Sequence, residues 1–116
     1  MSGWRVTVRT GPKVERVTAE TLAEALDAVE LHARAAANTE RRPPVDTRVR
    51  RYEPGDRVAV RAELRGRGVN AGVDVRGDGS VEAWTGRIRR RPLELRDDET
   101  PYEALRRTVQ STSVEP

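Results

Sequence analysis

The sequence predicts an α+β domain in which one long helix and one short C-terminal helix pack on one face of a mainly antiparallel sheet of about five or six strands. Three observations predict this class. Several segments alternate apolar and polar residues with period two, as strands buried on one face do. Two other segments carry a capping box followed by apolar residues at helical spacing. Gly, Pro and Asp separate the strand-like segments and predict hairpin turns.

The first predicted elements are a hairpin and a helix. Residues 4–8 alternate as WRVTV, Gly11-Pro12 interrupts the pattern, and residues 13–18 form a weaker return strand. Thr21 and Glu24 then form a capping box, and apolar residues at helical spacing predict a helix over 22–37 that ends near Asn38.

A linker and a second hairpin follow the helix. Two prolines keep the linker at 39–46 extended. Val45, Thr47 and Val49 alternate with charged residues, and the turn is EPGD at 53–56. The return strand at 57–65 alternates cleanly, which predicts one buried and one solvated face.

Two Gly-rich segments resemble binding motifs but are typical of turns. The segment RGRGVNAG at 65–72 leads into a strand, whereas a phosphate-binding loop leads into a helix. The RGD tripeptide at 76–78 lies between two strand-like segments, which favours an Asp-Gly hairpin turn over an adhesion motif. Asp74, Asp78 and Glu82 do not match the spacing of a calcium loop.

The last predicted strand carries a run of arginines. Residues 80–91 read as one strand whose apolar positions change parity near Gly86, which predicts a bulge there. Pro92 is expected to end ladder pairing. Thr100 and Glu103 form a second capping box with Pro at the first helical position, and the short helix reaches about Gln110.

Length and composition predict one domain over residues 1–110 and a flexible polar tail over 111–116. Only 35% of the 116 residues are hydrophobic, and none is Phe, so we expect a thin core. No run approaches the roughly 18 apolar residues of a membrane span, and the first residues lack the apolar stretch of a signal peptide. We therefore expect a cytoplasmic protein that does not bind membranes.

The composition offers few residues for an enzymatic or a metal-binding site. The chain has no Cys and one His, His32, which is either an acid, base or pH switch, or a half-exposed helical residue without a role. Asp97, Asp98 and Glu99 are the carboxylates left for catalysis, and they fall in a predicted solvated loop. We expect a non-enzymatic protein without a cofactor or a metal centre.

Charge distribution indicates where a partner would bind. Residues 41–91 carry a net charge of +7, whereas the flanking segments are slightly acidic. The candidate binding residues form a basic patch on the open sheet face, made of Arg61, Arg65, Arg87, Arg89 and Arg91. The 21 arginines against one Lys are also typical of nucleotide bias in a genome.

Three interpretations of this patch remain open. It pairs with the carboxylates of an acidic protein partner, it grips the phosphates of RNA or DNA, or it is a solvated face balanced by its own acids. The scarcity of aromatic residues disfavours base stacking. A homodimer is a further possibility, with Leu31, Leu93 and Leu95 as candidate contacts.

Overall fold

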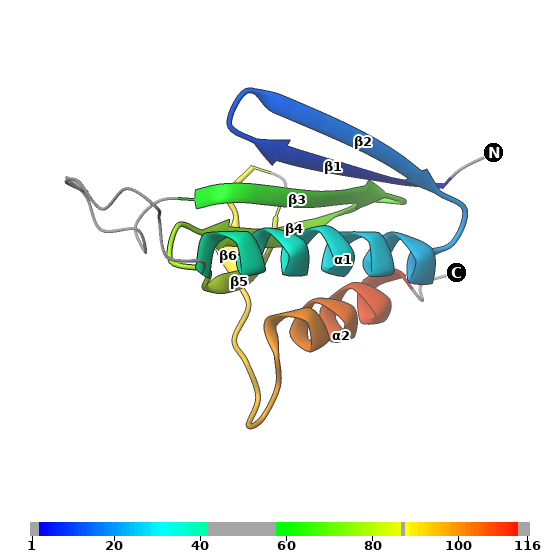
Figure 1. Cartoon of the computed structure of the whole chain (residues 1–116). Coiled ribbons are helices and arrows are strands. Elements are labelled where there is room, and N and C mark those ends of the chain that lie inside the picture. The colour runs from blue at the N-terminus through cyan, green and yellow to red at the C-terminus, as the bar shows by residue number, and fades with distance from the viewer. Residues whose placement is uncertain (1–2, 42–57, 87, 114–116) are drawn as a thin grey trace, which may run out of the picture.

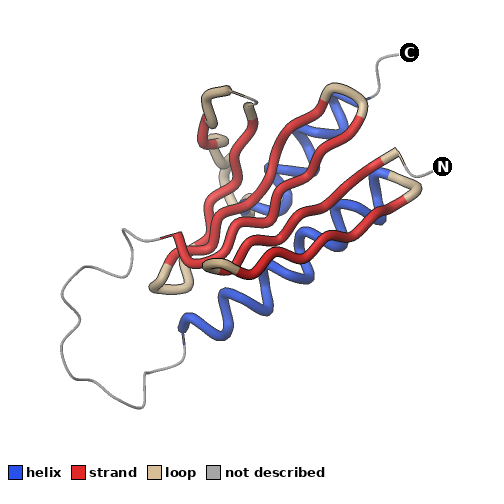
Figure 2. Tube along the Cα trace, turned by 90° about the horizontal axis from the view of Figure 1, so that it is seen from above, coloured by secondary structure: helices blue, strands red, loops and turns tan. Residues whose placement is uncertain are grey.

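The computed structural model describes residues 3–41, 58–86 and 88–113. It confirms the α+β class: a six-stranded antiparallel sheet carries one long helix and one short C-terminal helix. Both helices lie on the same face of the sheet (Figures 1 and 2). The elements are β1 (Trp4–Thr10), β2 (Lys13–Ala19), α1 (Leu22–Arg41), β3 (Val58–Gly66), β4 (Val69–Arg76), β5 (Val81–Thr85), β6 (Arg91–Pro92) and α2 (Pro101–Ser113).

The strand order is β2-β1-β3-β4-β5-β6, and each neighbouring pair is antiparallel. Gly11, with a φ of 58°, and Pro12 form the two-residue turn between β1 and β2, in agreement with a type II′ turn. Arg67 and Gly68 both have positive φ and form a type I′ turn between β3 and β4. The Gly-rich segment at 65–72 is therefore a tight hairpin.

The RGD tripeptide lies in the hairpin turn between β4 and β5, as the sequence predicts. The amide of Arg76 donates to the carbonyl of Ser80 at 2.9 Å. The Asp78 carboxylate accepts hydrogen bonds from the amide and the hydroxyl of Ser80, at 2.9 and 2.6 Å. Gly79 has a φ of 86°, a conformation that glycine adopts without strain. Turn chemistry accounts for these residues.

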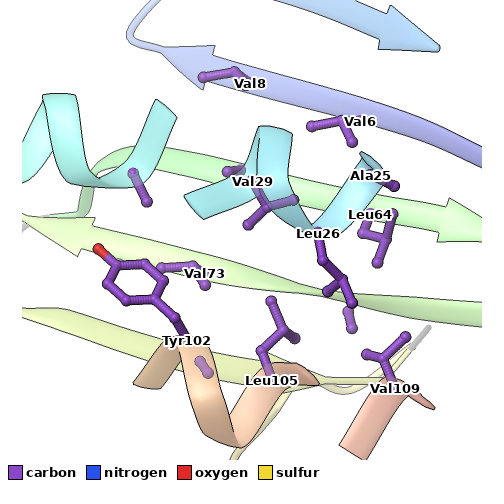
Figure 3. Packing of buried hydrophobic residues seen from close by; sticks show 14 of the residues in the cluster. Val6, Val8, Ala25, Leu26, Val29, Leu64, Val73, Tyr102, Leu105 and Val109 are labelled. Carbon is purple, nitrogen blue, oxygen red and sulfur yellow. The ribbon is translucent and has the colours of Figure 1, made fainter. Parts of the chain in front are cut away.

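The hydrophobic core lies between the sheet and the two helices. Helix α1 packs on β1, β3 and β4, and α2 packs on β4 and β5. In Figure 3, Leu26 and Val29 of α1 and Leu105 of α2 point into this layer. The core is built from small residues, as the composition predicts. Its largest fully buried side chains are Leu26, Leu64, Leu105, Val6, Val29, Val73, Val75 and Val109.

Both predicted capping boxes are present. The hydroxyl of Thr21 accepts the amide of Glu24 at 3.1 Å, and the Glu24 carboxylate accepts the amide of Thr21 at 3.2 Å. Thr100 and Glu103 form the same reciprocal pair at 3.1 and 2.8 Å. Each box satisfies backbone donors that a helix N-terminus leaves without an intrahelical partner.

Both helices continue past their predicted ends. Helix α1 runs to Arg41 instead of ending near Asn38, and the hydroxyl of Thr39 donates to the carbonyl of Ala35 at 3.1 Å within its last turns. Helix α2 runs to Ser113 instead of Gln110. Neither described helix is both long enough and apolar enough to cross a membrane.

The prediction of one strand over residues 80–91 is wrong. Strand β5 ends at Thr85, the chain reverses, and Arg91–Pro92 returns as β6 beside β5. Pro92 therefore takes part in pairing, on the outer edge of the sheet, where a residue without an amide proton is tolerated. The change of parity at Gly86 marks this reversal: its φ is 125°, and a Cβ there would collide with the carbonyl oxygen of Arg89.

Some predictions concern residues outside the described part of the chain. These are the first strand and the turn of the second hairpin, over 45–56, most of the linker at 39–46, residues 114–116 of the tail, and Arg87. The return strand of that hairpin is described and forms β3. The proposed single-domain boundary and the tail stay predictions.

Ion pairs hold α2 and the loop before it against the rest of the domain. Arg107 donates to Glu99 at 2.8 and 2.9 Å, and Glu99 also accepts the amide of Arg96 at 2.9 Å. Arg106 donates to Asp27 at 2.8 Å and to Glu30 at 3.1 Å, which links α2 to α1. The bonds from Arg107 and from the Arg96 amide lower the pKa of Glu99 from its ordinary 4.5 to about 2.

This shift predicts a pH dependence of stability. Because the pKa of Glu99 is lower in the folded state, its contribution is fully present above about pH 5 and is lost as the pH falls from 4.5 toward 2. We expect Glu99→Gln to unfold at lower urea concentration than the parent at pH 7, with the gap closing toward pH 2. Arg107→Gln should reduce the same pH dependence. Parallel curves for the parent and Glu99→Gln would contradict the assignment.

Candidate functional site: the open face of the sheet

The sheet face opposite the helices, called here the open face, is organised in rows of directly opposed residues. Residues opposite each other in an antiparallel ladder point to the same side. One row crosses the sheet as Arg9, Arg61, Asp74 and Glu82. The next row contains Arg16, Thr7, Glu63, Gly72, Trp84 and Pro92. A third contains Thr18, Arg5, Arg65 and Asn70.

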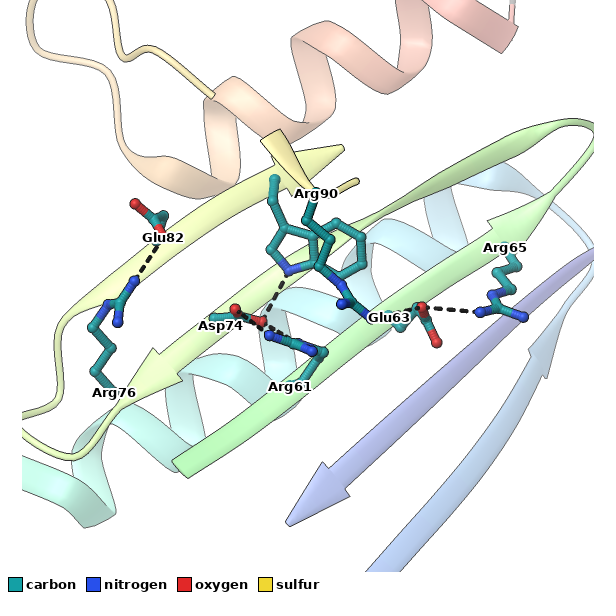
Figure 4. Close-up of polar contacts among 8 residues, drawn as sticks. Arg61, Glu63, Arg65, Asp74, Arg76, Glu82 and Arg90 are labelled. Carbon is teal, nitrogen blue, oxygen red and sulfur yellow. Dashed lines mark hydrogen bonds and ion pairs between the residues drawn. The ribbon is translucent and has the colours of Figure 1, made fainter. Parts of the chain in front are cut away.

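The half of the open face over β3, β4 and β5 is closed by a buried network. Trp84 is 2% exposed. It does not belong to the hydrophobic core, which lies on the helix side of the sheet. Its indole Nε1 donates to Asp74 at 2.9 Å. Arg61 donates to both oxygens of Asp74, at 2.7 and 2.9 Å (Figure 4). This bidentate bond raises the pKa of Arg61 above its ordinary value.

Glycine at position 72 makes room for the indole. Gly72 lies between Glu63 and Trp84 in its row, and a Cβ there would stand 2.8 Å from the Trp84 ring and would also collide with the carbonyl oxygen of Ala62. The Trp84 side chain therefore lies over the backbone of β4. Arg90, from the connection between β5 and β6, places its guanidinium carbon 4.9 Å from the indole ring centroid and covers it.

Glu63 is a buried carboxylate beside the indole. It is 5% exposed and accepts a hydrogen bond from Arg65 at 3.2 Å. An amino nitrogen of Arg90 lies 3.9 Å from the same carboxylate oxygen. We call Arg61, Glu63, Asp74, Trp84 and Arg90 the Trp84 cluster. In it every buried acid faces at least one guanidinium, as burial of a charge requires.

The half of the open face over β1 and β2 differs in charge. Its side chains are Arg5, Thr7 and Arg9 of β1 and Val14, Arg16 and Thr18 of β2. Arg5, Arg9 and Arg16 are exposed, and no acidic side chain pairs with them among the described residues. Each stands in a different row, so within this half of the open face three successive rows carry one exposed arginine each. We call these three arginines the arginine patch.

Like charges oppose each other across β1 and β3. Arg5 is directly opposite Arg65, and Arg9 is directly opposite Arg61. Like charges in such positions destabilise a sheet. Asp74 neutralises Arg61 and Glu63 partly neutralises Arg65, whereas Arg5 and Arg9 lack such a counter-charge among the described residues. The hairpin therefore maintains an exposed positive charge at a cost to folding stability.

A hollow of about 250 Å³ opens at one end of the arginine patch. Its lining residues come from the ends of β1, β2 and β3 and from the residue before β1: Gly3, Trp4, Arg5, Thr18, Arg65 and Gly66. Two guanidinium-bearing side chains therefore border a space that is large enough for a carboxylate side chain. Arg65 keeps 61% of its side chain exposed there.

The arginines predicted from the sequence lie in several environments. Arg61 and Arg65 share the open face, but Arg61 is committed to Asp74. Arg89 and Arg91 are exposed near the outer edge of the sheet. Arg91 is opposite Thr85, in the row of Ala71, so it lies on the side of the helices and not beside Arg61.

Arg5, Arg9, Arg16 and Arg90 were missed by the sequence prediction. Arg5 and Arg9 alternate with valines in the first strand, which already indicates that they leave the core. Their position beside Arg61 and Arg65 depends on β1 pairing with β3, which local patterns do not reveal. Arg90 belongs to the reversal between β5 and β6, where the sequence pattern predicts a continuous strand.

The remaining candidates from the sequence are His32 and the leucines proposed for a homodimer. His32 is half-buried in a hollow of about 220 Å³ that Glu15 and Glu40 also line. No group of three metal-ligating side chains occurs among the described residues. Leu31 and Leu95 are 69% and 50% exposed, whereas Leu93 packs against the core, and their role in a homodimer stays a prediction.

Comparison with protein-family models, curated proteins and solved structures finds no match to this chain. Functional inference therefore depends on the residues of the chain itself.

The Trp84 cluster predicts a strong effect of Asp74→Ala. The substitution leaves the indole donor and the Arg61 guanidinium without their acceptor, and we expect it to lower the free energy of unfolding by about 3 kcal/mol. The matched control is Glu82→Ala, which removes the more exposed pair with Arg76 and should cost less than about 1 kcal/mol. Urea denaturation followed by circular dichroism measures both. Equal effects of the two substitutions would contradict the assigned role of the cluster.

Proposed function

We propose that this protein is a non-enzymatic binding module whose arginine patch binds an acidic segment of a partner protein. The observation that carries the proposal is the charge of the β1–β2 half of the open face. Arg5, Arg9 and Arg16 occupy successive rows with no carboxylate partner among the described residues. A guanidinium forms short, charge-assisted and often bidentate bonds with carboxylates, so a series of acids is the ligand that best complements this surface.

A partner with carboxylates fits the surface better than a single-stranded nucleic acid. Proteins that hold single strands stack the bases on exposed aromatic side chains. The aromatic residues of the described chain are Trp4, Trp84 and Tyr102, and they are 5%, 2% and 7% exposed. None of them offers a ring face for a base. The phosphates of a nucleic-acid duplex are the competing ligand. Binding experiments distinguish them from an acidic protein segment.

The test compares two double variants that remove the same charge. Arg5→Gln with Arg16→Gln neutralises part of the arginine patch, and Arg89→Gln with Arg91→Gln neutralises two exposed arginines elsewhere. The probe is a fluorescent poly-glutamate peptide at low salt, followed by anisotropy. We expect the first pair to weaken binding about tenfold or more and the second to change it less than about twofold. The first pair should not lower the melting temperature, because it removes the repulsion between Arg5 and Arg65.

Other outcomes would overturn the proposal. Equal losses in the two double variants would mean that only net charge matters, and absence of peptide binding by the parent would remove the function altogether. Duplex and single-stranded RNA and DNA are tested in parallel over a salt series. Tighter, steeply salt-dependent binding to one of them would show a phosphate-binding module instead.

A further inference from the structure

The two edges of the sheet are built differently. At one edge, β6 has two residues, one of which is Pro92, so it offers little backbone for pairing. At the other edge, β2 has seven residues in unbroken register with β1 and contains no proline. Only Ala19 of β2 is buried, and the residues before it are exposed or half-buried. The β2 edge is therefore long, regular and accessible.

The direction of the backbone groups on β2 follows from the turn. In a two-residue hairpin the residues that flank the turn, Thr10 and Lys13, form a hydrogen-bonded pair, and such pairs alternate along the ladder. Glu15 and Val17 therefore direct their amide and carbonyl groups toward β1. Val14, Arg16 and Thr18 direct theirs outward. These are the β2 residues whose side chains lie on the open face, beside the arginine patch.

From this arrangement we infer that the acidic segment binds as an additional antiparallel strand on the β2 edge. The inference rests on the proposed function and adds the mode of binding. Antiparallel addition extends the existing pattern and places residues of the new strand opposite Val14, Arg16 and Thr18, about 4.8 Å away. Backbone hydrogen bonds to these three residues hold the strand. Acidic side chains at alternate positions set the specificity.

The arginine patch matches a strand with an acid at every second residue. Along a strand, side chains on one face recur about every 6.8 Å, which is also the spacing of the rows on the sheet. Arg16 borders the central acid directly. Arg9 and Arg5 lie behind the short side chains of Val14 and Thr18 in their rows, and long arginine side chains span one strand separation. Each of three alternate acids thus faces one guanidinium.

A second copy of the chain is a poorer occupant of this edge. An antiparallel pairing of two β2 strands along their full length is centred on Arg16, because the strand runs from Lys13 to Ala19. The two Arg16 side chains would then stand directly opposite each other, an arrangement that destabilises a sheet. The charge that attracts an acidic strand therefore also discourages self-association through the same edge.

The first experiment uses a labelled peptide of seven residues, Thr-Glu-Thr-Glu-Thr-Glu-Thr, and follows amide hydrogen exchange of the whole protein by NMR. We expect the peptide to slow exchange at Val14, Arg16 and Thr18, whose amides gain acceptors. Exchange at Glu15 and Val17, which are already bonded to β1, should change little. Binding without protection of Val14, Arg16 and Thr18 would mean that the peptide lies on the open face without joining the sheet, and would overturn the inference.

Peptide variants test the same point without altering the protein. N-methylation of the three Glu residues removes the donors that face β2 in the antiparallel arrangement, and it should weaken binding about tenfold or more. The control peptide Thr-Thr-Glu-Glu-Glu-Thr-Thr has the same charge but places its acids on both faces, and it should also bind more weakly. Equal affinity of all three peptides would show that only charge is recognised.

Val14→Pro tests the edge from the side of the protein. It removes an outward amide and retains all three patch arginines, and a proline is tolerated where the amide faces solvent. We expect peptide binding to fall about tenfold or more, whereas the matched Val14→Thr should bind within about twofold of the parent. Normal binding by Val14→Pro, together with weak binding by Arg5→Gln with Arg16→Gln, would overturn strand addition but leave the proposed function standing. A dimer that Val14→Pro dissociates, detected by light scattering, would identify a second copy as the occupant and overturn the inference.

Discussion

The hydrogen bond from the Trp84 indole to Asp74 determines how the open face is divided. The same carboxylate holds Arg61 through two bonds, so one buried acid ties β3, β4 and β5 together on the side away from the helices. This arrangement depends on Gly72, because any side chain there would occupy the space of the indole. A sheet with helices on one face thus acquires a second, smaller buried layer on the other.

The Trp84 cluster has consequences for the rest of the face. It uses the buried acids Asp74 and Glu63 to neutralise arginines of β3 and of the β5–β6 connection. No acid remains on the open face of β1 and β2, where Arg5, Arg9 and Arg16 project. On the described open face, the arginines without an acidic partner therefore lie beside the β2 edge, and the positions of the acids determine this as much as the positions of the arginines. Overall charge, only +3, conceals this asymmetry.

Local signals in the sequence predicted the elements, and long-range pairing determined the candidate site. Capping boxes and period-two patterns located both helices and most strands because these depend on neighbouring residues. The parity change at Gly86 fits either a bulge or a reversal of the chain. The two are distinguished by the close approach of the Arg89 carbonyl oxygen to Gly86, which the sequence does not reveal. Likewise, the burial of Trp84 and the opposition of Arg5 to Arg65 depend on strand registers between distant segments. The sequence therefore predicted Arg61 and Arg65 on the open face, but local patterns could not place Arg5 and Arg9 beside them.

The contrast between the two sheet edges connects fold and function. An exposed regular edge is a risk for aggregation, and natural sheets usually shorten it, cover it or interrupt it with proline. This chain does so at β6, where Pro92 follows the reversal at Gly86, but not at β2. Charged side chains at Lys13, Glu15 and Arg16 limit pairing with apolar or basic strands, and they leave pairing with an acidic strand favourable. The β2 edge has backbone groups that are free to pair with another strand, and its charged side chains favour an acidic one. Such an edge is suited to the selective binding of an acidic strand.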